Sequence, residues 1–158
     1  IIISQDRKVN LNDHLMLFFT GISRFSSEVA KSQISNMENC YSQMNELRDM
    51  VNEGSSILNN LNMPLDEFGK LLNRAWENKR SLSSKITNKK IDELYSTAIK
   101  AGAIGGKILG AGGGGFILFF VKPGDQDRVK KVLSNLIHVP FKFENTGSKV
   151  VLYQPNGF

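Results

Sequence analysis

Apolar residues recur at steps of three and four positions in several stretches of the chain, and this spacing predicts amphipathic helices that each bury one face. Methionine and aromatic side chains on these stripes are expected in the core. Gly54 is a candidate interruption of the longest stripe. The predicted helices span residues 28–34, 36–61, 65–76, 91–99 and 126–136.

Suitable residues stand at the ends of these predicted helices. Ser26 or Ser27 can cap the first helix, because a serine hydroxyl accepts a hydrogen bond from an amide of the first turn. Pro64 suits the first turn of the helix that follows it, since that position needs no amide donor. Asn88 can cap the next helix, and Gly102 can end it.

Short runs of bulky apolar residues predict strands. Residues 15–20 (LMLFFT) and 116–121 (FILFFV) form two such runs, and residues 107–109 form a shorter extended piece. Residues 141–144 and 150–153 flank a polar segment and predict a hairpin. About four strands and about five helices, without regular strand–helix repeats, predict an α+β fold in which helices pack on one face of an antiparallel sheet.

Composition and charge narrow the class of protein. The chain has 158 residues, 41% of them hydrophobic, which fits one globular domain. Its net charge of +5 comes from cations scattered among acids, so no nucleic-acid partner is predicted. No run is long enough to cross a bilayer, and no signal-peptide pattern opens the chain. The single cysteine, Cys40, agrees with a reducing cytoplasm, which is the expected location. His14 and His138 have no partners at metal-ligand spacing, so no metal site is predicted.

The first residues carry a separate expectation. The chain starts without methionine, inside the apolar run Ile1-Ile2-Ile3. This start predicts a fragment of a longer protein, in which a preceding part pairs with these residues. Pairing of the same edge with a second copy, giving a homodimer, is the alternative.

The run Gly110-Ala111-Gly112-Gly113-Gly114-Gly115 is a candidate functional segment. It formally satisfies G-x-G-x-x-G, but that dinucleotide fingerprint must open a helix, and a predicted strand follows here. Gly106-Lys107 does not complete a P-loop. That motif needs glycine where Ala101 stands, and serine or threonine where Ile108 stands.

Glycine costs backbone entropy, so four in succession need a reason. One reason is structural, namely a tight turn between strands that pack closely against another backbone. The other is functional, because backbone without side chains can approach a ligand or a phosphate loop and offer N–H donors. Lys107 adds a cation three residues before the run and favours the functional reason, although an isolated lysine is more often a surface residue.

The segment Lys107–Phe120 (KILGAGGGGFILFF) resembles the third sequence motif of the GHMP small-molecule kinases. In that family a Gly-rich loop follows a Lys- or Arg-containing stretch and runs into a core strand. Leu17–Arg24 (LFFTGISR) is similar to a segment of the sugar-kinase branch. The stretch Trp76–Leu82, followed by Ile91–Gly102 and Gly105-Gly106-Lys107, is similar to the same branch. The resemblance covers nearly the whole chain and is closest to the D-glycero-D-manno-heptose 7-phosphate kinases.

The resemblance implies a ferredoxin-like antiparallel sheet with helices on one face plus extra helices, formed by residues 1–158 as the C-terminal domain of a two-domain kinase. The family's Ser-rich phosphate loop and its acidic residue near the acceptor are not visible in this sequence. They are expected on an N-terminal domain absent from this chain. The implied reaction transfers the γ-phosphoryl group of Mg-ATP to a sugar phosphate, with the anomeric hydroxyl of the heptose as acceptor.

The resemblance also implies roles for named residues. Gly110, Ala111, Gly112, Gly113, Gly114 and Gly115 are expected to support the phosphate loop and to close over substrate. Lys107 is expected to add positive charge near a phosphate, and Thr20 to contact substrate. Arg24 could grip the sugar phosphate bidentately, or form an ordinary salt bridge. No catalytic base is identified. The implied partners are ATP with Mg²⁺, the sugar phosphate and the chain's own N-terminal domain.

A function of another class also fits the sequence. A ferredoxin-like module rich in glycine could bind a ligand or a partner without catalysis. Such a module would fold and bind unaided, whereas half of a kinase would release no ADP without its other domain.

Overall fold

The structure is a computed structural model that describes residues 3–23, 26–144 and 146–151. Six α-helices and two short 3-10 helices are described. They are α1 (Gln5–His14), α2 (Ser26–Ser35), η1 (Met37–Cys40), α3 (Tyr41–Asn59), α4 (Asp66–Ser81), α5 (Lys89–Lys100), η2 (Pro123–Asp125) and α6 (Gln126–Val132). No helix among these residues is long and apolar enough to span a membrane.

Four strands form one antiparallel sheet in the order β2-β3-β1-β4. They are β1 (Leu15–Phe19), β2 (Ala103–Ile108), β3 (Phe116–Val121) and β4 (Ile137–Val139). Helices connect β1 to β2 and β3 to β4, whereas β3 follows β2 directly. This is the ferredoxin-like β-α-β-β-α-β arrangement, so the predicted α+β fold is confirmed.

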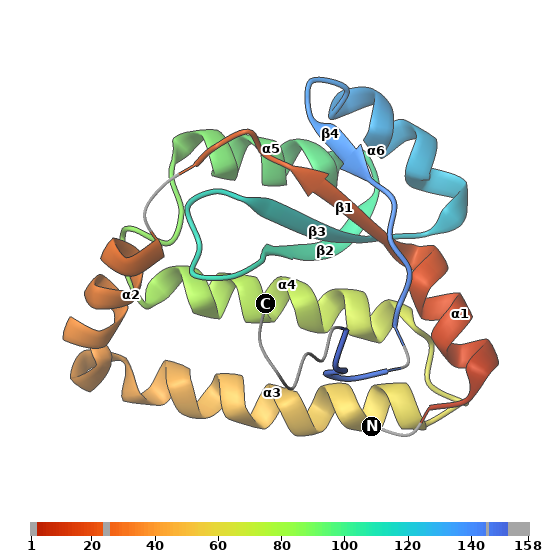
Figure 1. The fold of residues 1–158 in the computed structure, drawn as a ribbon, viewed down its shortest axis with the longest axis horizontal. Coiled ribbons are helices and arrows are strands. Elements are labelled where there is room, and N and C mark those ends of the chain that lie inside the picture. Colours follow the sequence, from red (N-terminus) through yellow and green to blue (C-terminus); the bar gives the residue numbers. More distant parts are fainter. Residues whose placement is uncertain (1–2, 24–25, 145, 152–158) are drawn as a thin grey trace, which may run out of the picture.

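Helices cover the sheet on two sides (Figure 1). The face that carries α5 and α6 is the expected one, and the extra helices α4 and α3 are stacked on the other. Ile117, Phe119 and Val121 of β3 join the main core with α5 and α6. Phe120, between them, joins a second core with α1, α3 and α4. Because both faces of β3 are covered, its sequence is a continuous apolar run without alternation.

Strand β2 is longer than predicted because it includes two glycines. Gly105 lies where α4 crosses the sheet, and a Cβ atom there would stand 2.0 Å from the carbonyl oxygen of Gly69. Only glycine permits this approach of two backbones. The predicted extended piece began only at residue 107, since glycine is depleted in strands.

Helix α1 was not predicted. Its N-cap Ser4 accepts a hydrogen bond from the amide of Arg7 at 3.2 Å. Val9 and Leu11 are the apolar residues in the helix, so no stripe marks it in the sequence. Ile3, just before it, packs on the second core, and residues 1 and 2 of the predicted pairing edge lie outside the described part of the chain.

The other helices agree with the prediction in position and differ at their ends. Asn88 caps α5 by accepting a hydrogen bond from the Ile91 amide at 3.1 Å, as predicted. Gly54 does not interrupt α3; it is buried, and a Cβ there would lie 3.2 Å from Leu71. The first residues of the helix predicted at 36–61 form the 3-10 helix η1 rather than α-helix. Helix α4 starts two residues after Pro64, and α6 ends at Val132, before residue 136.

Ser26 is the first residue of α2, so Ser26 and Ser27 are both inside the helix. The cap prediction for these serines is therefore wrong, and the residue that precedes the helix lies outside the described residues.

The predicted hairpin is wrong in its first arm. Residues 141–144 form no strand, and the fourth strand is β4. The side chain of Asn12 replaces a strand partner here: it donates to the Phe141 carbonyl at 3.3 Å and accepts from the Phe143 amide at 3.1 Å. Of the second predicted arm, residues 150 and 151 form no strand, and residues 152 and 153 lie outside the described residues.

Candidate functional site at the glycine loop

Residues 109–115 connect β2 to β3, and we call this connection the glycine loop. It lies at the end of the molecule where β1 ends, α4 ends and α2 and α5 begin (Figure 1, left). Segments from four separate parts of the sequence therefore meet around the predicted site. Only the fold brings them together.

The loop has a backbone path that favours glycine. Four of its residues have positive φ, namely Gly110 (75°), Gly112 (109°), Gly113 (67°) and Gly115 (81°). Gly112 is restricted by space as well, since a Cβ there would stand 2.8 Å from the carbonyl oxygen of Ile86. A side chain at this position would displace the segment between α4 and α5.

Four side chains from four elements hold the loop by donating hydrogen bonds to its carbonyl oxygens. The bonds are Thr20 Oγ1 to Gly115 (2.8 Å), Gln33 Nε2 to Ala111 (2.7 Å), Lys79 Nζ to Gly110 (2.5 Å) and Asn88 Nδ2 to Gly113 (3.2 Å). These bonds hold the loop in one shape, because each donor lies in, or directly beside, a helix or strand.

The loop amides divide into two groups. The amide of Gly113 donates to Ile86 at 2.5 Å, and that of Gly115 donates to Ile22 at 2.9 Å. Within the described part of the chain, the amides of Gly110, Ala111, Gly112 and Gly114 donate no hydrogen bond. Unused N–H groups on a glycine-rich backbone are suitable donors to an anion such as a phosphate.

Thr20, one of the predicted substrate residues, is 2% exposed. Its hydroxyl donates to the Gly115 carbonyl and accepts from the Ile22 amide at 3.3 Å. The first interaction connects the end of β1 to the end of the glycine loop, and the second is local to the turn that follows β1. The structure thus brings Thr20 to the predicted loop in a supporting position.

Of the two predicted cations, only Lys107 belongs to the described residues, and it lies away from the loop. Lys107 is half-buried on β2 and lines a groove of about 300 Å³ whose other lining residues belong to α3 and α4. Arg24 lies outside the described residues, so its predicted contact with a sugar phosphate stays a prediction.

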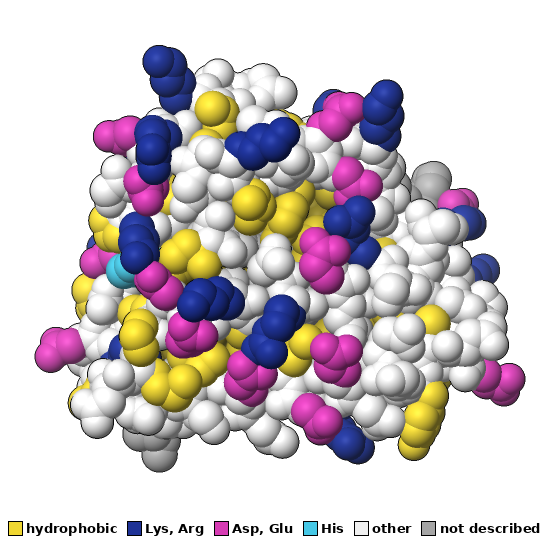
Figure 2. Space-filling view, turned by 180° about the vertical axis from the view of Figure 1, so that it is seen from behind, with side chains coloured by type: hydrophobic (Ala, Val, Ile, Leu, Met, Phe, Trp, Pro, Cys, Tyr) yellow, Lys and Arg dark blue, Asp and Glu magenta, His cyan; other side chains and the backbone are white. Residues whose placement is uncertain are grey.

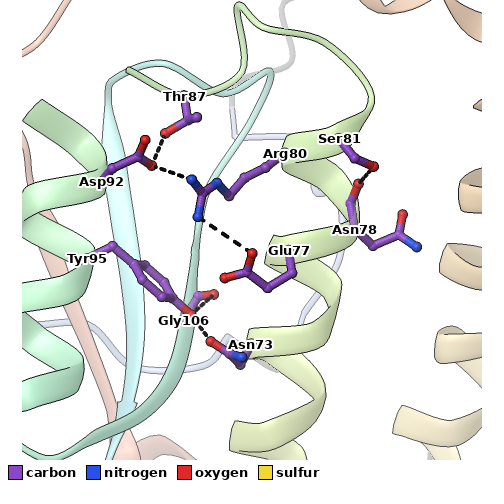
Figure 3. Close-up of polar contacts among 9 residues, drawn as sticks. All are labelled: Asn73, Glu77, Asn78, Arg80, Ser81, Thr87, Asp92, Tyr95 and Gly106. Carbon is purple, nitrogen blue, oxygen red and sulfur yellow. Dashed lines mark hydrogen bonds and ion pairs between the residues drawn. The ribbon is translucent and has the colours of Figure 1, made fainter. Parts of the chain in front are cut away.

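A polar cluster connects α4 and α5 beside β2 (Figure 3). Tyr95 donates from its hydroxyl to Asn73 Oδ1 at 2.6 Å and to the Gly106 carbonyl at 3.3 Å. Burial, and then the charge of Glu77, raise the pKa of Tyr95 above its ordinary value, so the hydroxyl stays protonated. This tyrosine therefore acts as a donor that secures β2 and is unsuited to be a general base.

The same cluster contains a chain of ionic contacts. Arg80 Nη2 lies 3.1 Å from Asp92 Oδ1, and its Nη1 lies 3.6 Å from Glu77 Oε2. Asp92 Oδ1 also accepts a hydrogen bond from the Thr87 hydroxyl at 2.7 Å. Thr87 stands between Ile86 and Asn88, the two residues that contact Gly113.

Charges elsewhere are mixed. In the view from behind, basic and acidic side chains alternate across the surface without a continuous basic patch (Figure 2). The described residues contain no cluster of three or more His, Cys, Asp or Glu that could hold a metal ion. His14 stacks on Phe120, with ring centroids 5.0 Å apart. Burial, with a smaller effect from Lys130, lowers the pKa of His138.

Sequence reasoning located the loop and missed most of its supports. Asn88 was identified as a helix cap, but its second contact with Gly113 depends on the fold. Gln33 stands on a predicted helix, and Lys79 lies just beyond the predicted helix at 65–76; polar residues there are expected on the solvent side and give no local signal of a long-range contact.

Comparisons with known proteins agree with this fold and this loop. The sequence model of the family described as GHMP kinases C terminal matches residues 58–138, which include α4, α5, β2, the glycine loop and β3. The D-glycero-alpha-D-manno-heptose 7-phosphate kinase of Campylobacter jejuni is 26% identical over 125 residues, which are 78% of this chain and 36% of that protein.

Two other proteins are similar over comparable lengths of this chain. The L-fucokinase/L-fucose-1-P guanylyltransferase of Bacteroides fragilis is 29% identical over 131 residues, covering 75% of this chain and 13% of that protein. The crystal structure of the Methanococcus jannaschii mevalonate kinase superposes with a TM-score of 0.71 at 20% identity, covering 88% of this chain and 42% of that one. The chain thus spans less than half the length of each of these relatives.

Proposed function

Because the chain belongs to the GHMP kinase family as its C-terminal domain, we propose that it forms one wall of the active site of an ATP-dependent small-molecule kinase. The family match covers the glycine loop and the helices beside it. Small-molecule kinases depend on positioning and on neutralising charge, which a rigid loop of backbone donors can provide.

The observation that carries this proposal is the combination of bracing and unused donors in the glycine loop. Four side chains hold its carbonyl groups, and four of its amides make no hydrogen bond within the described chain. A loop that served only as a turn would not need anchors from four elements. We assign the loop to support of the nucleotide phosphates, with the phosphate-binding loop itself on a preceding domain.

ATP fits the loop through its backbone. The amides of Gly110, which is exposed, and of Ala111, which is half-buried, are available to donate to phosphate oxygens or to an adjacent phosphate loop. The Mg²⁺ ligands are assigned to the preceding domain, since the described residues form no carboxylate cluster. When bound, Mg²⁺ would neutralise charge on the phosphates. This chain would supply the glycine loop as one side of the nucleotide site.

The acceptor class is a sugar phosphate, and we name D-glycero-D-manno-heptose 7-phosphate as the first candidate. The Campylobacter jejuni relative carries this activity in its name and shares 26% identity over most of the chain. Fucose and mevalonate are the acceptors in the names of the other two relatives and serve as competing candidates.

The test is an ADP-release assay on the full-length protein with heptose 7-phosphate, fucose and mevalonate as separate acceptors. We expect turnover with the heptose phosphate, and none from the 158-residue chain alone. ADP release with fucose or mevalonate instead would reject heptose 7-phosphate as the acceptor and would still support a kinase. Ligand binding without ADP release from any acceptor would favour the non-enzymatic module.

Within this assay, Gly112→Ala should lower kcat by about a hundredfold, because the new Cβ displaces Ile86 or the loop. Gly102→Ala is the matched control: its φ of 115° is also positive, and it follows the far end of α5. We expect the control to retain kcat within about twofold. Equal losses in the two variants would show that backbone strain alone explains the effect.

A further inference from the structure

The segment Ile86–Asn88, between α4 and α5, is the surface on which the middle of the glycine loop rests. Its Ile86 carbonyl accepts the Gly113 amide at 2.5 Å, and its Asn88 side chain donates to the Gly113 carbonyl at 3.2 Å. Both polar groups of Gly113 are therefore held by one three-residue segment, which we call the loop bed. Any shift of the bed must move Gly113 with it.

The middle residue of the bed, Thr87, connects it to charged residues. Its hydroxyl donates to Asp92 Oδ1 at 2.7 Å, and the same oxygen lies 3.1 Å from Arg80 Nη2. Arg80 is in the last turn of α4, and Asp92 is in the first turn of α5. One carboxylate oxygen thus joins both helices to the bed (Figure 3).

Other contacts limit how Arg80 can move. Oε2 of Glu77 lies 3.6 Å from Nη1 of Arg80. The guanidinium carbon of Arg80 lies 6.0 Å from the ring centre of Trp76, which is fully buried. The side chain of Arg80 is 31% exposed and that of Asp92 is 36% exposed. An ion pair at this exposure contributes little to stability, so its main effect would be on geometry.

We propose that Arg80 and Asp92 are positioning residues for the reaction, acting through Thr87 to set the place of the loop bed and of Gly113. The inference rests on the proposed function, because it assigns to this pair the orientation of the active-site wall. Neither residue needs to touch substrate. Their effect is transmitted by the two hydrogen bonds between the bed and Gly113.

The decisive variant is Asp92→Ala in the full-length protein, with Glu93→Ala as its matched control. Glu93 is the next acid of α5, and its ion pair is a 4.0 Å contact with the exposed Lys89. Both substitutions remove one negative charge from the first half of the same helix. Only Asp92→Ala removes the acceptor of Thr87.

Hydrogen exchange of a peptide covering residues 109–116, followed by mass spectrometry, measures the loop directly. We expect faster exchange in Asp92→Ala than in the wild type, because the Gly113 amide is released, and unchanged exchange in Glu93→Ala. On the kinase, Asp92→Ala should lower kcat about tenfold, with the melting temperature close to that of the control.

Thr87 provides a second route if Asp92→Ala folds poorly. Thr87→Val keeps the shape and removes the hydroxyl, so it should reproduce the faster exchange and lower kcat. Thr87→Ser keeps the hydroxyl and should restore both. A role in stability alone would change the melting temperature in these variants and leave kcat of the folded enzyme intact.

The outcomes separate this inference from the function on which it rests. Unchanged exchange of the loop peptide in Asp92→Ala and Thr87→Val overturns the positioning role, whatever the activity. Faster exchange with unchanged kcat also overturns it. If the two variants exchange faster but the wild-type protein shows no kinase activity with any acceptor, the result supports the chain of contacts and rejects the proposed function.

Discussion

The Nη2 atom of Arg7 donates a hydrogen bond of 2.7 Å to the carbonyl oxygen of Met63, on a segment far away in the sequence. The same nitrogen donates to Ile57 at 2.8 Å and lies 3.3 Å from the Asn60 oxygen. One guanidinium therefore satisfies carbonyl groups at the end of α3 and just after it. Its positive charge also suits the negative end of a helix dipole.

We expect Arg7→Met to lower the free energy of unfolding by about 3 kcal/mol, because it leaves buried carbonyl groups without a donor. Urea unfolding followed by circular dichroism measures the change. Arg48→Met is the control, since Arg48 is 73% exposed and contacts the adjacent Asp49. If the two variants unfold at the same urea concentration, Arg7 does not stabilise the end of α3.

The close approach of α4 to β2 gives a second prediction. A Cβ atom on Gly105 would overlap the carbonyl oxygen of Gly69, so Gly105→Ala forces the helix away from the sheet. We expect a loss of about 3 kcal/mol in unfolding free energy, as for an overpacked core. Gly124→Ala, where nothing lies within 4 Å of the added Cβ, should unfold like the wild type.

Thr20 provides a third prediction, at the edge of the candidate site. Thr20→Val keeps the volume of the side chain and removes the donor to Gly115. In the full-length enzyme we expect kcat to fall about tenfold and the free energy of unfolding to fall by about 1–2 kcal/mol. Thr20→Ser should keep most of the activity.

Thr97→Val is the matched control for Thr20, because Thr97 also donates from its hydroxyl to a backbone carbonyl, that of Glu93, on the exposed side of α5. Both substitutions exchange one hydroxyl for one methyl group. Equal kinetic effects of Thr20→Val and Thr97→Val would mean that the contact with the glycine loop has no special importance.

Local sequence signals were sufficient for the elements whose pattern is strong. The runs at β1 and β3 and the stripe of α5 with its Asn88 cap were predicted close to their observed places. Helix α1 has no such pattern, because it is held by the buried Arg7 and by Leu11 rather than by an apolar stripe. Helix α1 is therefore stabilised by tertiary contacts, which hydrophobic periodicity cannot predict.

The site shows the same division. The glycine loop is visible in the sequence because glycine is costly without a structural reason. Most of its supports could not be predicted, since Gln33 and Lys79 are ordinary polar residues until the fold brings them to the loop. The polar cluster around Arg80 connects α4 to α5, and no spacing rule links residues on different helices.

The hydroxyl of Tyr95 gives a prediction that depends on pH. Burial raises the pKa of Tyr95 above the ordinary value of 10.0, so the folded protein resists its ionisation more than the unfolded chain does. The associated stability is therefore fully present below pH 10 and is lost as the pH rises above the unfolded value. At about pH 11 the native protein and Tyr95→Phe should show equal tyrosinate absorbance per chain, whereas in urea the wild type should show more. A larger native absorbance in the wild type would mean that Tyr95 ionises in the folded state, and the assignment of its hydroxyl as a permanent donor to Asn73 and Gly106 would then be wrong.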